Sequence, residues 1–232
     1  MVLVLSVVIT YACYLFNVRF NIDLTLLSIA IIFPLVFSIR GSFRRRENAM
    51  EHLSEFKSTL HTVEHYLLSK PELVDLFATE VRAILNDINT TVLDHLSQHD
   101  DDMKATDKAM SKMATFMQQH HDNIPRQVKD KVIRFMKDMH ESVENLNAIH
   151  IHRTPISLKA YCLIFINIFP FIYTPTIIMN VGASQPIWIV YGIVILTQFI
   201  LISLYNIQNQ LEYPFDSIGI DDINLENFRL ER

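Results

Sequence analysis

The charged residues of this chain are concentrated in its middle. Residues 1–39 and 156–207 are almost free of charge, whereas residues 40–153 carry most of the acids and bases. A soluble protein of 232 residues would spread its apolar side chains along the whole chain, because every element contributes to the core. The segregation therefore predicts two membrane-embedded ends with a polar domain between them.

Each apolar end divides into two helical runs joined by a short link. The runs comprise residues 1–16 and 24–39, then 156–179 and 187–205. The first two are slightly short of the ~20 residues that span a bilayer. Pro34 would kink the second run, which membrane helices tolerate when a neighbour satisfies the freed carbonyl. We predict two transmembrane hairpins, at residues 1–39 and 156–207.

Basic residues indicate the orientation of these hairpins. The most basic stretch follows the second run and contains Arg40, Arg44, Arg45 and Arg46. Arg153 and Lys159 flank the start of the third run, whereas the links at 17–23 and 179–186 hold one Arg and no Lys. The positive-inside rule then places both termini and the middle domain in the cytoplasm, which predicts a multi-pass inner-membrane protein.

The middle domain, residues 40–155, shows helical periodicity. Pro71 and Pro125 separate helices predicted at 47–69, 71–96, 103–121 and 126–149. Apolar residues recur at three- and four-residue spacing, which is typical of a bundle core. In the second and fourth helices they are Leu73, Leu76, Phe77, Val81, Ile84, Leu85, Ile88, Val92 and Leu96, then Val128, Val132, Phe135, Met136, Met139, Val143 and Leu146. Residues 208–232 form a polar, acidic tail.

Several function classes are disfavoured. The net charge of -5 argues against a nucleic-acid partner, which would require a basic surface. Cys13 and Cys162 lie far apart inside apolar runs, which suits buried reduced thiols and not a disulfide or a metal site. Asn89-Thr90-Thr91 matches a glycosylation acceptor, but a cytoplasmic location would leave it unused. We expect no cofactor.

One short motif has an enzymatic interpretation. His61-Thr62-Val63-Glu64-His65 spells H-x-x-E-H, in which two histidines could hold Zn²⁺ and Glu64 could act as general base. Such a site needs a third ligand and a cleft, and the motif is short enough to arise by chance. We favour a solvated helix face, and hence a protein that is not an enzyme and holds no metal.

Three segments resemble a known family. They are Thr154-Pro155-Ile156-Ser157-Leu158-Lys159-Ala160-Tyr161, Leu211-Glu212-Tyr213-Pro214-Phe215-Asp216 and Asp221-Asp222-Ile223-Asn224-Leu225. In order and spacing they resemble the T-P-I-P-x-x-Y, E-N-P-F-G and N-D-L-x-L elements of the bestrophin ion channels, in particular the bacterial members. The matching residues are Thr154, Pro155, Tyr161, Glu212, Pro214, Phe215, Asp221 and Asp222. Ser157 replaces the second proline and Asp216 the glycine.

The resemblance implies an all-α homopentameric channel that conducts chloride or other small anions. Bestrophins line a narrow apolar neck with bulky residues of the second transmembrane helix, just before an arginine. By that pattern the neck here would comprise Ile31, Leu35 and Ile39, with Phe33 and Phe37 as the alternative register. The ring formed by Arg40 and its neighbours would favour anions. The alternative function is a non-conducting membrane scaffold whose helical domain binds a cytoplasmic partner.

Overall fold

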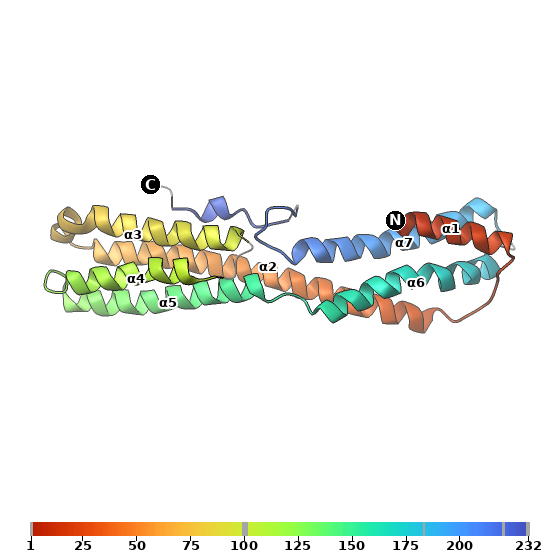
Figure 1. Cartoon of the computed structure of the whole chain (residues 1–232), viewed down its shortest axis with the longest axis horizontal. Coiled ribbons are helices and arrows are strands. Elements are labelled where there is room, and N and C mark those ends of the chain that lie inside the picture. The colour runs from red at the N-terminus through yellow and green to blue at the C-terminus, as the bar shows by residue number, and fades with distance from the viewer. Residues whose placement is uncertain (1, 99–101, 183, 220, 231–232) are drawn as a thin grey trace. The chain divides into compact units, whose positions relative to one another are not determined.

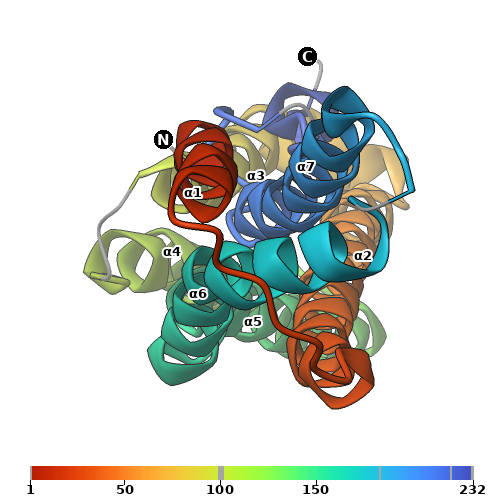
Figure 2. The same cartoon turned by 90° about the vertical axis from the view of Figure 1, so that its right-hand side faces the viewer.

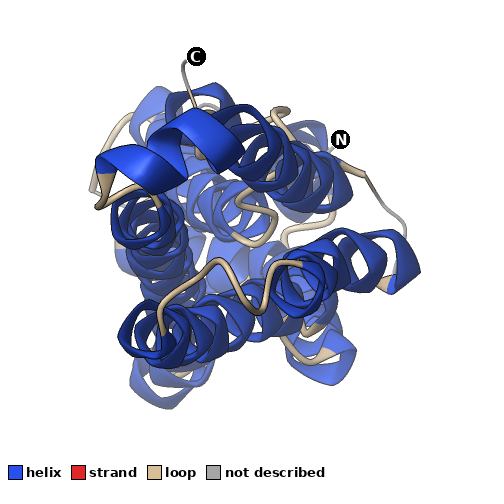
Figure 3. Cartoon of the chain, turned by 90° about the vertical axis from the view of Figure 1, so that its left-hand side faces the viewer, coloured by secondary structure: helices blue, strands red, loops and turns tan. Residues whose placement is uncertain are grey.

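The computed structural model describes residues 2–98, 102–182, 184–219 and 221–230, and the regular structure within these ranges is entirely helical (Figures 1 and 3). The all-α class predicted from the sequence is confirmed. The elements are α1 Val2–Leu15, α2 Thr25–Leu67, α3 Pro71–Ser97, α4 Lys104–Gln119, α5 Arg126–Ile151, α6 Ile156–Asn180, α7 Ile187–Leu211 and the short 3₁₀ helix η1 Leu225–Phe228.

The chain folds as two compact units. Met1–Phe43 and Thr154–Glu212 form one, which we call the apolar unit. Arg44–Arg153 and Tyr213–Arg232 form the other, the polar unit.

In the apolar unit, α1, α6 and α7 pack against one another, as Figure 2 shows. The first part of α2 joins them through Ile31, which lies in an apolar cluster with Ile166, Phe169 and Leu201. A second cluster comprises Ile9, Cys13, Ile178 and Val190. Because α6 and α7 are apolar on all sides, packing within the unit leaves large side chains such as Trp188 and Leu196 exposed, as lipid-facing positions require.

Three helical stretches are long and apolar enough to cross a membrane, within Thr25–Leu67, Arg126–Asn180 and Ile187–Leu211. The second of these ends with α6. Helix α1 is apolar but has only 14 residues, so at 1.5 Å per residue it covers roughly 20 Å of a hydrocarbon layer about 30 Å thick. The lengths therefore support three of the four predicted spans, and the first hairpin as a whole stays a prediction.

Helix α2 runs unbroken from Thr25 to Leu67. The sequence predicted helical segments at 24–39 and 47–69, and the arginine-rich stretch between them is helical as well. The residues after Pro34 explain the continuity, since arginine, glutamate, alanine and methionine are good helix formers and the next proline is Pro71. Gly41 alone costs about 1 kcal/mol relative to alanine, which a long packed helix absorbs.

The polar unit has one apolar core, formed by α2, α3, α4 and α5 together with Phe215, Ile223 and Leu230. The predicted stripes on α3 and α5 supply most of it, but Leu76 is an exception at 65% exposed. Leu76 precedes Phe77 by one residue, and each step turns a helix by about 100°. With Leu73, Phe77 and Val81 facing the core, Leu76 falls beside this face instead of on it.

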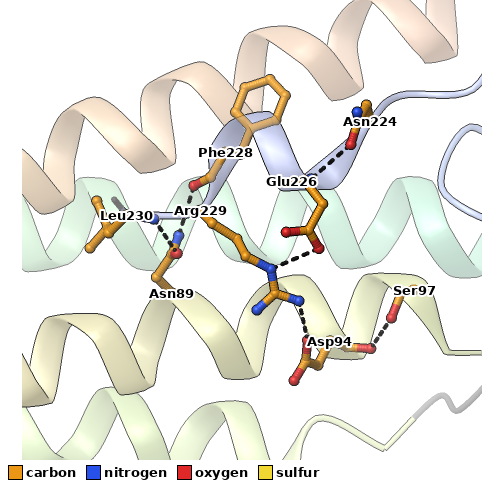
Figure 4. A network of polar contacts seen from close by, with 8 residues as sticks. All are labelled: Asn89, Asp94, Ser97, Asn224, Glu226, Phe228, Arg229 and Leu230. Atoms are coloured by element: carbon orange, nitrogen blue, oxygen red, sulfur yellow. Dashed lines mark hydrogen bonds and ion pairs between the residues drawn. The ribbon is translucent and has the colours of Figure 1, made fainter. Parts of the chain in front are cut away.

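The C-terminal segment is tied to α3 by the side chain of Asn89 (Figure 4). Its Nδ2 donates to the Phe228 carbonyl at 3.1 Å, and its Oδ1 accepts from the Leu230 N–H at 3.0 Å. Arg229 donates to Asp94 at 3.1 Å and to Glu226 at 2.9 Å. Asn89 is 1% exposed, so the acceptor motif noted in the sequence has a structural role.

Candidate functional site

Two of the sequence motifs meet at a buried carboxylate in the apolar unit. Glu212 directly follows α7 and is 2% exposed. Its Oε1 accepts a hydrogen bond from the Thr154 N–H at 3.1 Å, across a separation of 58 residues, and its Oε2 forms an ion pair with Lys159. The carboxylate also lies close to the first turn of α6, where negative charge is favourable. These contacts join the start of α6 to the end of α7.

Tyr161 connects α6 to the part of α2 that contains Pro34. Pro34 has no N–H, so the carbonyl of Ala30, four residues earlier, loses its helical partner. The Tyr161 hydroxyl donates to this carbonyl at 3.1 Å. An apolar surrounding makes an unpaired carbonyl costly, and the tyrosine removes that cost.

Helix α6 contains the same arrangement. Pro170 frees the carbonyl of Ile166. Gln198 on α7, which is 1% exposed, donates to that carbonyl from Nε2 at 2.8 Å. No motif in the sequence pointed to this role of Gln198. The available signal was the position of Gln198 as the one amide of the apolar run 187–205, together with Pro170 in the apolar run before it.

The third motif belongs to the polar unit and forms a compact loop. The Ile223 N–H donates to the Pro214 carbonyl at 2.8 Å, and Phe215 is buried in the core of this unit. Arg153 lies over the Tyr213 ring, with its guanidinium carbon 4.7 Å from the ring centroid. Arg46 of α2 donates from Nε to the Asp221 carbonyl at 2.5 Å. The loop is thus fastened to two earlier parts of the chain, α2 through Arg46 and the segment after α5 through Arg153.

This loop also contains a pair of carboxyl groups. Burial, followed by hydrogen bonding to Asp216, raises the pKa of Asp222 to about 6. The Gly219 N–H donates to Asp222 Oδ2 at 2.7 Å. A Cβ at position 219 would lie 2.5 Å from Asp222 Oδ1, so only glycine allows this approach. The Asp222 carboxyl therefore keeps its proton to a higher pH than a free aspartate does.

The four arginines of the basic run differ in their surroundings. Arg40, in the apolar unit, is exposed, and so is Arg44 in the polar unit. Arg46 is engaged with Asp221, while Arg45 Nη1 is buried without a hydrogen-bond partner among the described residues. Arg40 and Arg44 are thus the two members of the basic run that are exposed to solvent.

No protein-family model matches the chain, and no curated protein matches it. Solved structures do. A bacterial bestrophin homologue from Klebsiella pneumoniae superposes with a TM-score of 0.76 at 13% identity, over 98% of this chain and 91% of that one. A variant of that homologue superposes with a TM-score of 0.77 at 13% identity, over 98% of this chain and 91% of the variant. A structure described as a membrane protein superposes with a TM-score of 0.78 at 12% identity, over 97% of this chain and 90% of that one. This chain has the bestrophin fold. At such low identity the likeness concerns the fold and nothing more.

Within the bestrophin fold, the structure distinguishes the two faces of α2. Ile31 and Leu35 are 1% and 0% exposed within the chain, whereas Phe33 and Phe37 are 56% and 62% exposed. The Phe33 and Phe37 ring centroids lie 6.0 Å apart along the same face. A side chain that lines a pore shared between subunits has to be exposed in each separate subunit. Phe33 and Phe37 meet this condition within one chain, whereas Ile31 and Leu35 are buried and Ile39 is half-buried.

The H-x-x-E-H motif lies on α2 in the polar unit. Its Glu64 accepts a hydrogen bond from Arg82 Nε at 2.9 Å, while His61 and His65 are exposed. In the parts of the chain that the structure describes, no three His, Cys, Asp or Glu side chains cluster in a way that could hold a metal ion. The arrangement gives no support to a zinc hydrolase. Cys13 and Cys162 are free and buried, as predicted.

Proposed function

We propose that this protein is a bestrophin-like channel in which five copies surround an axial pore for chloride or other small anions. The observation that carries the proposal is the exposed apolar face of α2 in a unit with the bestrophin fold. On a soluble protein such a face would be a liability. On a subunit of a membrane channel, an exposed apolar helix face can line a pore or contact a neighbouring copy.

We place the neck at Phe33 and Phe37. Five copies of two stacked phenylalanine positions would form narrow apolar rings that exclude ordered water and can gate by dewetting. Ile31 then has a different function, because its contacts with α6 and α7 hold α2 against the rest of its own subunit, and Leu35 is buried one turn further along. Pro34 lies between the two phenylalanines, where Tyr161 supports the interrupted backbone.

Exposed arginines support the preference for anions. Arg40 follows Phe37 by three residues, so in a helix the two lie on neighbouring faces. A ring of five such guanidinium groups would create a positive potential where the apolar neck ends. Under the positive-inside rule the same arginines support a cytoplasmic location for this end of the pore and for both termini, in the inner membrane.

Conduction by purified protein in liposomes tests the proposal. Wild type should pass chloride, and Phe37→Ala should raise the rate several-fold because a wider neck retains water. Phe199→Ala is the matched control, since Phe199 on α7 is 52% exposed but lies outside the proposed neck. Its rate should equal that of the wild type.

Two results would contradict the proposal. Liposomes that stay sealed with wild type, Phe33→Ala and Phe37→Ala alike would exclude a pore at this face. A particle mass in detergent that corresponds to one or two chains would instead favour the non-conducting scaffold.

A further inference from the structure

The polar unit contains a cavity that the channel proposal does not use. It has a volume of about 530 Å³ and lies between α4 and α5. Its apolar lining comes chiefly from Met110, Met113 and Met117 on α4 and from Val132, Ile133 and Met136 on α5. Protein interiors rarely leave voids larger than a few waters, whereas ligand sites usually occupy 300–1,000 Å³. The size of this cavity is that of a ligand site.

Methionine dominates the lining. Met110 and Met113 are 1% and 0% exposed, so they form the floor of the cavity, while Ile133 is 63% exposed at its mouth. Thioether side chains are flexible and polarizable and adapt to apolar guests of varied shape. A polar metabolite would leave its own hydrogen-bonding groups unpaired against this floor, at considerable cost. The lining therefore selects an apolar body.

Among the described residues that line the cavity, Lys129 is the one with a formal charge at neutral pH. Lys129, His121 and His140 contribute to its wall, and none of the described lining residues is an aspartate or a glutamate. Lys129 Nζ donates to the His121 carbonyl at 2.6 Å, which holds the ammonium group near the α4–α5 turn. An ammonium has three donors, so two remain for a ligand. Asp122 contacts His121 at 3.4 Å, but its side chain is fully exposed to water.

We propose that this cavity binds a fatty-acid carboxylate, with its chain among the methionines and its head at Lys129. Charge complementarity decides between amphiphiles, because a cationic head would face Lys129 and a neutral head would gain no ion pair there. The site is distinct from the proposed pore, since every residue that lines it belongs to the polar unit.

Photolabelling of the full-length protein in nanodiscs of a zwitterionic lipid tests this site. The probe is dodecanoic acid with a diazirine at the chain end, and the labelled peptides are mapped by mass spectrometry. We expect label on residues 110–118 and 132–140, and competition by dodecanoate. Dodecanol should compete about tenfold less well, the size expected for loss of one charge-assisted hydrogen bond.

Three variants make the test specific. Ala114→Phe places a ring in the cavity from an exposed position and should abolish labelling there. Lys129→Gln should weaken dodecanoate competition about tenfold and leave dodecanol unchanged. Lys131→Gln is the matched control, since its ammonium lies over the Tyr66 ring at 4.6 Å, away from the cavity. It should label like wild type.

Label confined to the membrane helices, or label in the cavity that neither Ala114→Phe nor Lys129→Gln reduces, would overturn the proposal. A change of particle mass caused by Ala114→Phe would also overturn it, because the groove would then be a contact between copies. Circular dichroism confirms that each variant is folded before labelling.

Discussion

Two interior prolines show how single residues shape the apolar unit. Pro34 in α2 and Pro170 in α6 each lie inside a continuous helix and free a carbonyl four residues earlier. A side chain from another helix then donates to each freed carbonyl, Tyr161 to Ala30 and Gln198 to Ile166. The backbone thus stays satisfied beside both prolines, where an apolar surrounding offers no water as a partner.

Tyr161→Phe removes one of these donors without changing the shape of the side chain. We expect a loss of about 1 kcal/mol in the free energy of unfolding, because the Ala30 carbonyl is left unpaired. Thermal unfolding in detergent measures the change. Tyr11→Phe is the control, since Tyr11 is 62% exposed, and it should leave the midpoint unchanged. Equal midpoints for both variants would show that the hydrogen bond contributes nothing.

The Asp216–Asp222 pair makes the loop at 214–223 sensitive to pH. Because the folded-state pKa of Asp222 is raised to about 6 from 3.8, the folded loop binds its proton more tightly than the unfolded chain does. The stabilisation is therefore complete below pH 3.8 and is lost as the pH rises through 6. Hydrogen exchange in this loop, corrected for intrinsic rates, should show less protection at pH 7.5 than at pH 5. Asp222→Asn should remove the difference, and a difference that persists would contradict this assignment.

At the scale of elements, α3 holds the C-terminal segment through its backbone. The side-chain amide of Asn89 donates to the Phe228 carbonyl and accepts from the Leu230 N–H, in the way that a neighbouring strand would. The contact therefore does not depend on the side chains of Phe228 and Leu230. Lys57 of α2 adds a hydrogen bond to the Asn227 carbonyl at 2.9 Å. Leu230 itself is 7% exposed, so these hydrogen bonds and the burial of an apolar side chain hold the same segment (Figure 4).

Asn89→Ala should release this segment. Two buried backbone groups lose their partners, so we expect faster hydrogen exchange at 227–230 and a cost of about 2 kcal/mol in unfolding free energy. Exchange followed by mass spectrometry measures the release. Asn86→Ala, one helical turn earlier on an exposed position, should change neither quantity. Unchanged exchange at 227–230 in Asn89→Ala would show that apolar burial alone retains the segment.

At the scale of the whole molecule, the proposed pore exists only when copies assemble. The expected particle has five times the 27.0 kDa of one chain. Arg40→Glu would convert the proposed positive ring into a negative one, so it should shift the reversal potential in a salt gradient from anion toward cation preference. Arg126→Glu, an exposed arginine of the polar unit, is the control and should leave the potential unchanged. An unaltered potential in Arg40→Glu would place the selectivity elsewhere.

The sequence by itself determined the helical class, the apolar ends and most of the core of the polar unit. Helices with one apolar face, such as α3 and α5, reveal their buried side through periodicity, so residues such as Phe77 and Val132 could be assigned in advance. Short motifs pointed to the fold now seen in the solved structures, although at 13% identity most of the chain carried no such signal.

Only the tertiary structure decided which face of α2 is buried in the apolar unit. That part of α2 is apolar all round, so periodicity cannot separate Ile31 and Leu35 from Phe33 and Phe37, and contacts with α6 and α7 make the choice. The hydrogen-bond partners of Ala30, of Ile166 and of the C-terminal segment could not be predicted from the sequence either. Each partner lies more than 30 residues away in the chain, and a local sequence pattern does not predict contacts between residues that far apart.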